Sequence, residues 1–133
     1  MIYIVPDTNF LIYTFKHKIN LDYEIERAIN TKYKIIILDK VKDELEYLLK
    51  NKDLKGKEKL AIKLALNKIK NYELVETDID GEADIAILEF AKKHKDRVIV
   101  ATNDKELKNK LLEENIPIMV VRQKKYFEVF GMV

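Results

Sequence analysis

The chain has 133 residues, of which 47% are hydrophobic and 36% charged, so it is long enough and apolar enough to bury a core of ordinary size. It has no cysteine, which excludes a disulfide framework and a thiolate metal site, and no apolar run near the roughly 18 residues that a membrane span requires. The net charge of +2 is too small to indicate nucleic-acid binding by itself. We expect a cytoplasmic protein with neither a signal peptide nor a membrane segment.

Apolar runs typical of strands alternate along the chain with helical patterns. The strand-like runs cover residues 2–5, 33–38, 72–75, 98–101 and 116–121, and the helical patterns cover 9–16 with 21–30, 40–51 with 57–71, 81–94 and 104–114. The runs are continuously apolar, as expected for parallel strands covered on both faces. We therefore predict one α/β domain over residues 1–133, a three-layer α/β/α, doubly wound parallel sheet. A basic tail, 122–133, either pairs at a sheet edge or stays mobile.

Polar residues directly follow the first and fourth strand-like runs. Ligands of such sheets bind at the carboxyl ends of the strands, where Asp7 and Asp104 are expected. The structural alternative for each is a helix N-cap. Asn9 can cap the first helix in place of Asp7, and Asn103 with Glu106 has the spacing of a capping box. We therefore expect Asp104 to be free on the first turn of its helix.

Two further acids are selected by helical periodicity at 100° per residue. In "KVKDELEYLLK", Glu44 lies at the edge of the apolar side, whereas Asp43 lies on the opposite, solvated face. In "DGEADIAILEFAKKH", Asp84 lies within the apolar arc, whereas Glu82 and Glu89 project away. A carboxylate in an apolar stripe is costly unless it is compensated, and a salt bridge to Lys or Arg is the structural alternative.

Together the four acids form a constellation at one rim of the predicted sheet. Asp7 and Asp104 end strands, and Glu44 and Asp84 lie in helices that begin at the same rim. Four converging carboxylates repel one another and raise one another's pKa. Mg²⁺ or Mn²⁺, which bind carboxylate oxygens, remove this cost. The residues therefore predict an acidic metal site at the carboxyl ends of the strands.

Four segments resemble the acidic motifs of PIN-domain nucleases, in register over essentially the whole chain. These are "PDTNFLI", "VKDELEYL", "ADIAILEFA" and "VIVATNDKELKNKL". The tail "IPIMVVRQKKYFEVFG" further resembles the small archaeal and eukaryotic PIN proteins of the pre-ribosomal RNA processing branch, rather than toxins.

The resemblance implies a metal-dependent endoribonuclease acting in ribosomal RNA processing, with a five-stranded sheet in the order 3-2-1-4-5. It implies catalytic and metal-binding roles for Asp7, Glu44, Asp84 and Asp104, supported by Asn9, Thr102 and Asn103. A bound Mg²⁺ or Mn²⁺ would activate a water for attack on the phosphodiester. No histidine is needed as a base, and we expect His17 and His94 to be surface or boundary residues. A homodimer is expected from the resemblance alone.

Basic residues in the tail are candidates for binding RNA phosphates. Arg122, Lys124 and Lys125 stand beside Tyr126, directly after the carboxyl end of the last strand. A second group, at positions 55, 57, 59 and 63, is explained at least as well by a solvated Lys/Glu face.

The sequence leaves two alternative functions open and disfavours a third. Within the nuclease class, the chain can be the toxin of a toxin–antitoxin module. A catalytically silent RNA-binding assembly factor would have the same residues. A phospho-acceptor receiver domain would need adjacent acids after the first strand and a Lys after the last, and the chain has neither. Asp39, which imitates the acceptor, is better interpreted as the N-cap of its helix.

Overall fold

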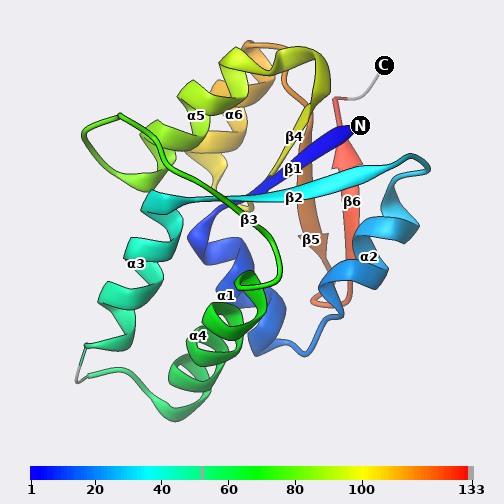
Figure 1. Cartoon of the computed structure of the whole chain (residues 1–133). Helices are drawn as coiled ribbons and strands as arrows, with labels where there is room; N and C mark the ends of the chain where they lie inside the picture. Colours follow the sequence, from blue (N-terminus) through cyan, green and yellow to red (C-terminus); the bar gives the residue numbers. More distant parts are fainter. Residues whose placement is uncertain (52, 132–133) are drawn as a thin grey trace.

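A six-stranded sheet forms the centre of the fold, in the order β3-β2-β1-β4-β5-β6 (Figure 1). The computed structural model describes residues 1–51 and 53–131, so the last two residues of the predicted basic tail lie outside the described part. The strands are β1 (Ile2–Pro6), β2 (Tyr33–Leu38), β3 (Glu73–Val75), β4 (Val98–Ala101), β5 (Ile118–Arg122) and β6 (Tyr126–Phe130). β1 to β5 are mutually parallel. The predicted five-strand order is thus confirmed, with one strand added.

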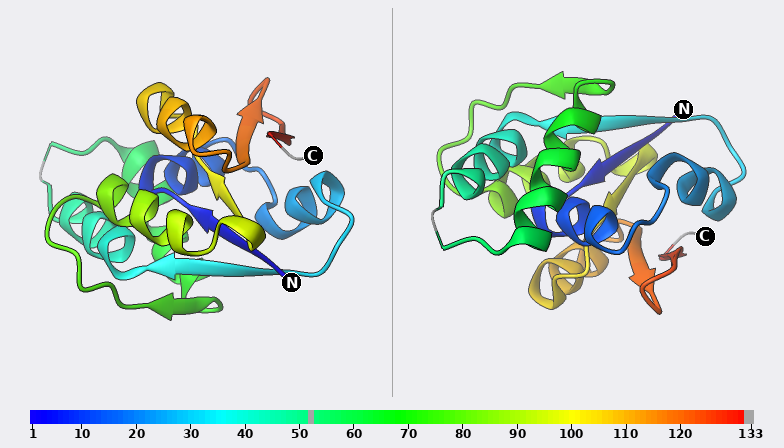
Figure 2. Two further views of the ribbon diagram at one scale, coloured as in Figure 1. Left: turned by 90° about the horizontal axis from the view of Figure 1, so that it is seen from above. Right: turned by 90° about the horizontal axis from the view of Figure 1, so that it is seen from below.

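Helices cover both faces of this sheet (Figure 2). They are α1 (Thr8–Lys16), α2 (Leu21–Ala28), α3 (Asp39–Leu49), α4 (Gly56–Ile69), α5 (Ala83–Lys93) and α6 (Lys105–Glu113), with a short 3-10 helix, η1 (Lys95–Arg97). α5 packs on α6 on one face, whereas α1 packs on α4 on the other. α3 contacts both α4 and α5. No helix in the described part of the chain is long and apolar enough to cross a membrane.

The two central strands are buried because both faces carry helices. Val5 of β1 and Val100 of β4 are fully buried, and Ile4 and Ile99 are 1% exposed. Because successive strand residues point to opposite faces, continuous burial means that each face of the sheet has its own packed layer. The continuously apolar runs of the sequence have this physical origin.

The basic tail adds the sixth strand. β6 pairs antiparallel with β5, with Ile118 opposite Phe130 and Arg122 opposite Tyr126. This pairing satisfies the backbone groups that β5 would otherwise leave open at the edge of the sheet. β5 also begins two residues later than the predicted run, at Ile118. The tail is therefore a structural element of the sheet, the first of the two arrangements considered from the sequence.

Candidate active site

A pocket of about 170 Å³ opens at the carboxyl ends of β1 and β4. Its lining residues come from the starts of α1, α5 and α6 and from α3, and they are Asp7, Thr8, Asn9, Glu44, Glu82, Ala83, Asp84, Asp104 and Leu107. All four acids selected from the sequence lie around this pocket, together with a fifth, Glu82. The parallel sheet gathers them because the carboxyl ends of its strands meet at one rim.

Asp7 lies at the floor of the pocket and is 8% exposed. Pro6 of β1 pairs with Ala101 of β4, and Asp7 N donates to Ala101 O at 2.9 Å. Asp7 and Thr102, the residues that follow the two strands, therefore lie side by side. One carboxylate oxygen of Asp7 accepts from Phe10 N at 2.7 Å, and the other accepts from the hydroxyl of Thr102. Asp7 is therefore both the N-cap of α1 and a pocket acid, and the alternative cap, Asn9, is not used.

Burial raises the pKa of Asp7 to about 6. The hydrogen bonds from Thr102 and Phe10 favour the ionised form, whereas the charges of Asp104 and Glu44 disfavour it. The two neighbouring carboxylates thus act electrostatically on Asp7, as expected for a shared site. Half of the Asp7 side chains are protonated at about pH 6.

The predicted capping box at the start of α6 is wrong. Asp104 itself is the N-cap, and its Oδ1 accepts from Leu107 N at 2.8 Å. Asp104 N in turn donates to Thr102 Oγ1 at 3.0 Å. The side chain of Asn103 instead pairs with the backbone of Val121, accepting at 2.8 Å and donating at 3.2 Å. Asn103 therefore ties β5 to the end of β4 and does not line the pocket.

The helix acids lie at the open side of the pocket. Glu44 and Asp84 are both exposed, so the prediction that Asp84 is buried in an apolar arc is wrong. The prediction that Glu82 projects away is also wrong. α5 begins only at Ala83, and Glu82 is extended (φ −79°, ψ 165°), so helical periodicity does not describe its direction. Gly81, with φ of 123°, makes the turn that brings the chain to this point.

Three other residues considered from the sequence lie outside the acidic pocket. Asp39 is the first residue of α3 and not its N-cap, and its carboxylate accepts from Lys40 N at 2.9 Å and Thr77 Oγ1 at 2.8 Å. His17 packs on an aromatic ring of α1, and His94 packs 4.4 Å from the ring of Phe90. Both histidines are boundary residues, as expected.

The donor set of the pocket fits a hard divalent cation. Within residues 1–51 and 53–131, none of the five carboxylates pairs with a Lys or Arg side chain. The hydroxyl of Thr8, which also lines the pocket, is buried without a hydrogen-bond partner in the same part of the chain. Among the described residues, no three of these acids are close enough together to coordinate a metal ion without moving their side chains. Mg²⁺ and Mn²⁺ prefer oxygen ligands such as these carboxylates and this hydroxyl. No Lys or Arg side chain of the described chain competes for them.

A larger cavity lies at the opposite end of the sheet. It measures about 820 Å³ and is lined by Met1 and Tyr33, at the amino ends of β1 and β2. Its acids are already engaged, since Asp22 pairs with Lys68 at 2.8 Å and Glu26 accepts from the Tyr33 hydroxyl at 3.3 Å. The smaller acidic pocket is therefore the better candidate for metal-dependent chemistry.

Comparisons with known proteins agree on the family. The model of the PIN like domain matches residues 4–124. The chain is 72% identical over 130 residues to Ribonuclease VapC4 of Methanocaldococcus jannaschii, covering 98% of both chains. It is 36% identical over 121 residues to Ribonuclease VapC9 of Archaeoglobus fulgidus, covering 91% of this chain and 84% of that protein.

The fold agrees with the same assignment. The solved structure of the PIN domain endonuclease Utp24 superposes with a TM-score of 0.77 and 28% identity, covering 98% of this chain and 92% of that one. The chain thus belongs to the PIN-like domain family and is a ribonuclease, a hydrolase that in this family depends on divalent metal ions.

Proposed function

We propose that the chain is an endoribonuclease that hydrolyses RNA phosphodiester bonds with Mg²⁺ or Mn²⁺ held by Asp7, Glu44, Asp84 and Asp104. The observation that carries the proposal is the pocket of five carboxylates without a protein cation. A structural salt-bridge site would have a Lys or Arg among its lining residues, and this pocket has none. Repulsion at the site is relieved only when a cation or protons enter it.

The residues of the chain have separable roles in this proposal. The divalent ion, when bound, lowers the pKa of a water molecule and stabilises negative charge on the phosphate. Thr102 holds the Asp7 carboxylate in place, and the capping hydrogen bond of Asp104 fixes that carboxylate at the start of α6. The buried hydroxyl of Thr8 and the amide of Asn9 line the same pocket and are available to hydrogen-bond a phosphate oxygen or a water.

The biological role has two candidates, each with its own support. The resemblance of the tail supports a role in ribosomal RNA processing, and the fold is similar to that of the PIN domain endonuclease Utp24. The relatives named VapC, one of them 72% identical, support the ribonuclease of a toxin–antitoxin module to a similar degree. The homodimer implied by the resemblance, and the cytoplasmic location expected from the composition, are part of the same proposal.

Asp104→Asn tests the chemistry. Asn retains the size and the N-cap hydrogen bond but removes the charge that a hard cation requires. Metal-dependent cleavage of single-stranded RNA should fall by roughly two or more orders of magnitude, corresponding to about 3–4 kcal/mol of transition-state stabilisation. Asp43→Asn, on the exposed face of α3, is the matched control and should cleave like the parent. Equal cleavage by Asp104→Asn, or by the parent in EDTA, would exclude a metal-dependent nuclease.

The two biological roles are separated by expressing the chain alone in a bacterial host. A toxin-type ribonuclease should arrest growth, and co-expression of the product of the neighbouring gene should relieve the arrest. An rRNA-processing enzyme should leave growth unaffected and cut a precursor ribosomal RNA transcript at a defined position. Asp104→Asn serves as the inactive control in both assays.

A further inference from the structure

Two neighbouring turns at the carboxyl rim of the sheet hold side chains in a backbone conformation that favours glycine. Lys18 follows α1 with φ of 58°, and Gln123 and Lys124, in the turn between β5 and β6, have φ of 52° and 56°. The hydrogen bond from Ile19 N to Thr14 O (2.9 Å) makes the end of α1 a Schellman motif, in which Gly is the usual residue. The two lysines therefore occupy these positions against the local backbone preference.

The end of α6 has the same left-handed backbone conformation, but with a residue type that adopts it more readily. Asn115, with φ of 61°, occupies the corresponding position there, and Ile116 N donates to Leu111 O at 2.9 Å. Asn tolerates the left-handed region better than Lys because its short side chain can hydrogen-bond locally. The backbone conformation at Lys18 therefore does not explain why this residue is a lysine. The charged side chain must have a separate role.

The turn between β5 and β6 is electrostatically coupled to the end of α1, because the charge of Lys124 acts on His17. Burial lowers the pKa of His17, and the charges of Lys124, Lys16 and Lys57 lower it further. Lys16 and Lys18 flank His17 in the chain, and Lys57 directly precedes Glu58. The one acid that opposes the shift, Glu58, pairs with Lys16 at 2.5 Å. Lys18, Lys57 and Lys124 are exposed and form no ion pair with the described residues.

A groove along α1 adjoins the acidic pocket at Asn9 and extends to the Lys16–Glu58 ion pair, next to His17 and Lys57 in the chain. It has a volume of about 330 Å³ and is lined by Asn9, by Tyr13, by the paired Lys16 and Glu58, and otherwise by apolar side chains. The ring of Tyr13, which lines the groove, lies 4.2 Å from the ring of His17, and the pair offers a stacking surface. From Asn9 to Lys16 the helix rises roughly 10 Å, a span of a few nucleotides of extended strand.

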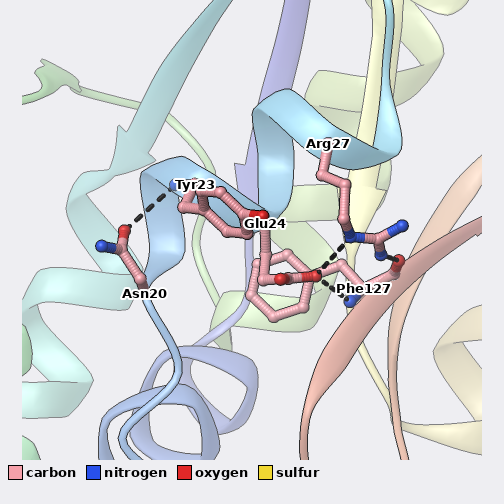
Figure 3. Close-up of polar contacts among 5 residues, drawn as sticks. All are labelled: Asn20, Tyr23, Glu24, Arg27 and Phe127. Carbon is pink, nitrogen blue, oxygen red and sulfur yellow. Dashed lines mark hydrogen bonds and ion pairs between the residues drawn. The ribbon is translucent and has the colours of Figure 1, made fainter.

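The hairpin that carries Lys124 is fixed to α2 (Figure 3). The buried carboxylate of Glu24 accepts from Phe127 N at 3.1 Å and from Arg27 Nε at 3.0 Å. Arg27 Nη2 donates to Phe127 O at 2.7 Å, and the guanidinium lies 5.5 Å from the centre of the Tyr126 ring. The outer edge of β6 is thus held by two side chains, which keeps the turn beside the end of α1.

Arg122, one of the three basic tail residues selected from the sequence, makes contacts within the hairpin. Arg122 pairs with Glu128 at 3.2 Å and lies 5.0 Å from the centre of the Phe130 ring, so its charge is used within the hairpin. Of the three basic tail residues selected from the sequence, Lys124 is the one whose charge acts on the His17 cluster.

We propose that Lys18, Lys57 and Lys124, around the Tyr13–His17 pair, form a second phosphate-binding subsite for the single-stranded RNA whose scissile phosphate enters the acidic pocket. The strand follows the groove along α1 and places a phosphate a few nucleotides from the cut between the two turns. This inference rests on the proposed endoribonuclease function. It means that the enzyme holds a long single strand more tightly than a substrate too short to span the groove.

The test is a triple variant, Lys18→Gly, Lys57→Gln and Lys124→Gly. Glycine removes two charges and also suits the positive φ at those positions, so the variant should melt no lower than the parent. For a single-stranded RNA of about 12 nucleotides, KM should rise roughly tenfold with kcat unchanged. The slope of log KM against log salt should fall by about 2, since each contact to a single-strand phosphate contributes about 0.7. Cleavage of a dinucleotide should not change.

The matched control replaces Lys32, Lys70 and Lys93 by Gln, three exposed lysines near the amino ends of β2, β3 and β4. It should change KM less than twofold. The proposal is overturned if the test variant binds and cuts the long RNA like the parent, or loses as much on the dinucleotide as on the long RNA. Fluorescence anisotropy with the same RNA in EDTA measures binding even if no cleavage occurs, which separates failure of this inference from failure of the proposed function. If the test variant binds RNA like the parent but no longer binds poly-glutamate, the lysines bind an acidic protein partner. This result would also overturn the proposal.

Discussion

At the scale of single residues, the acids of the pocket combine structural and electrostatic roles. Asp7 caps α1 while its second oxygen accepts from Thr102, and Asp104 caps α6. A cap needs only one carboxylate oxygen, and Asn or Ser would serve equally well. The negative charge of these residues is therefore not required for the caps, and at Asp7 it is costly because the side chain is buried.

Asp7→Asn should make the metal-free protein more stable at neutral pH. Folding raises the pKa of Asp7 from 3.8 to about 6, so between these values the native state binds more protons than the unfolded state. The free energy of unfolding therefore falls as pH rises through this window, by up to about 3 kcal/mol. Asn retains the cap, but Thr102 must reorient its hydroxyl, so we expect a gain on the order of 1–2 kcal/mol at pH 7.

Urea denaturation in EDTA between pH 4 and pH 7 measures this effect. The difference in unfolding free energy between Asp7→Asn and the parent should grow with pH. The difference between Asp43→Asn and the parent should be the same at every pH. A constant difference across the range would show that Asp7 does not titrate as described.

At the scale of elements, side chains from distant segments hold the ends of the sheet. Asn103 pairs with the backbone of Val121 and thereby joins the end of β4 to β5. Glu24 and Arg27 do the same for the outer edge of β6. An edge strand with open backbone groups is a template for aggregation, and here two of those groups are satisfied by α2.

Glu24→Ala should destabilise the protein and loosen β6. It leaves Phe127 N without an acceptor and Arg27 without its partner, at a cost of about 2 kcal/mol. Glu26→Ala, an exposed site two residues further along α2, should change stability by less than about 0.5 kcal/mol. Hydrogen exchange at the Phe127 amide should accelerate only in Glu24→Ala. Unchanged exchange there would mean that the hairpin is held by packing alone.

At the scale of the whole molecule, a doubly wound sheet concentrates negative charge at one rim, in a chain whose net charge is +2. α1, α5 and α6 all begin there, so an ion held by Asp7, Asp84 and Asp104 would link the starts of three helices. Binding at such a place is coupled to the stability of the entire fold, because the unfolded chain has no equivalent site.

Mn²⁺ or Mg²⁺ should therefore raise the melting temperature of the parent. At a free concentration 100 times the dissociation constant the gain in unfolding free energy is about 2.7 kcal/mol. Asp104→Asn should gain much less, because one ligand is lost. NaCl at matched ionic strength controls for simple screening of the carboxylates. An equal rise with NaCl would show that the pocket binds no specific ion.

The sequence by itself determined the parallel sheet, the approximate positions of its five parallel strands and the four acids around the pocket. These depend on local patterns: continuous apolar runs, helical spacing, and the rule that strand ends share a rim. It did not determine which residue caps α6, since Asn103 and Asp104 have similar local preferences. The side chain of Asn103 accepts a hydrogen bond from the backbone of Val121, 18 residues away, and therefore does not cap the helix.

Tertiary structure alone decided the remaining features. Thr102 reaches Asp7 across 95 residues of chain, and Arg27 reaches Phe127 across 100. Glu82 enters the pocket because α5 begins after it, at a boundary that helical periodicity does not resolve. The charge of Lys124 acts on His17 for the same reason, since hydrogen bonds and packing between remote segments, and not local sequence preference, place the β5–β6 turn.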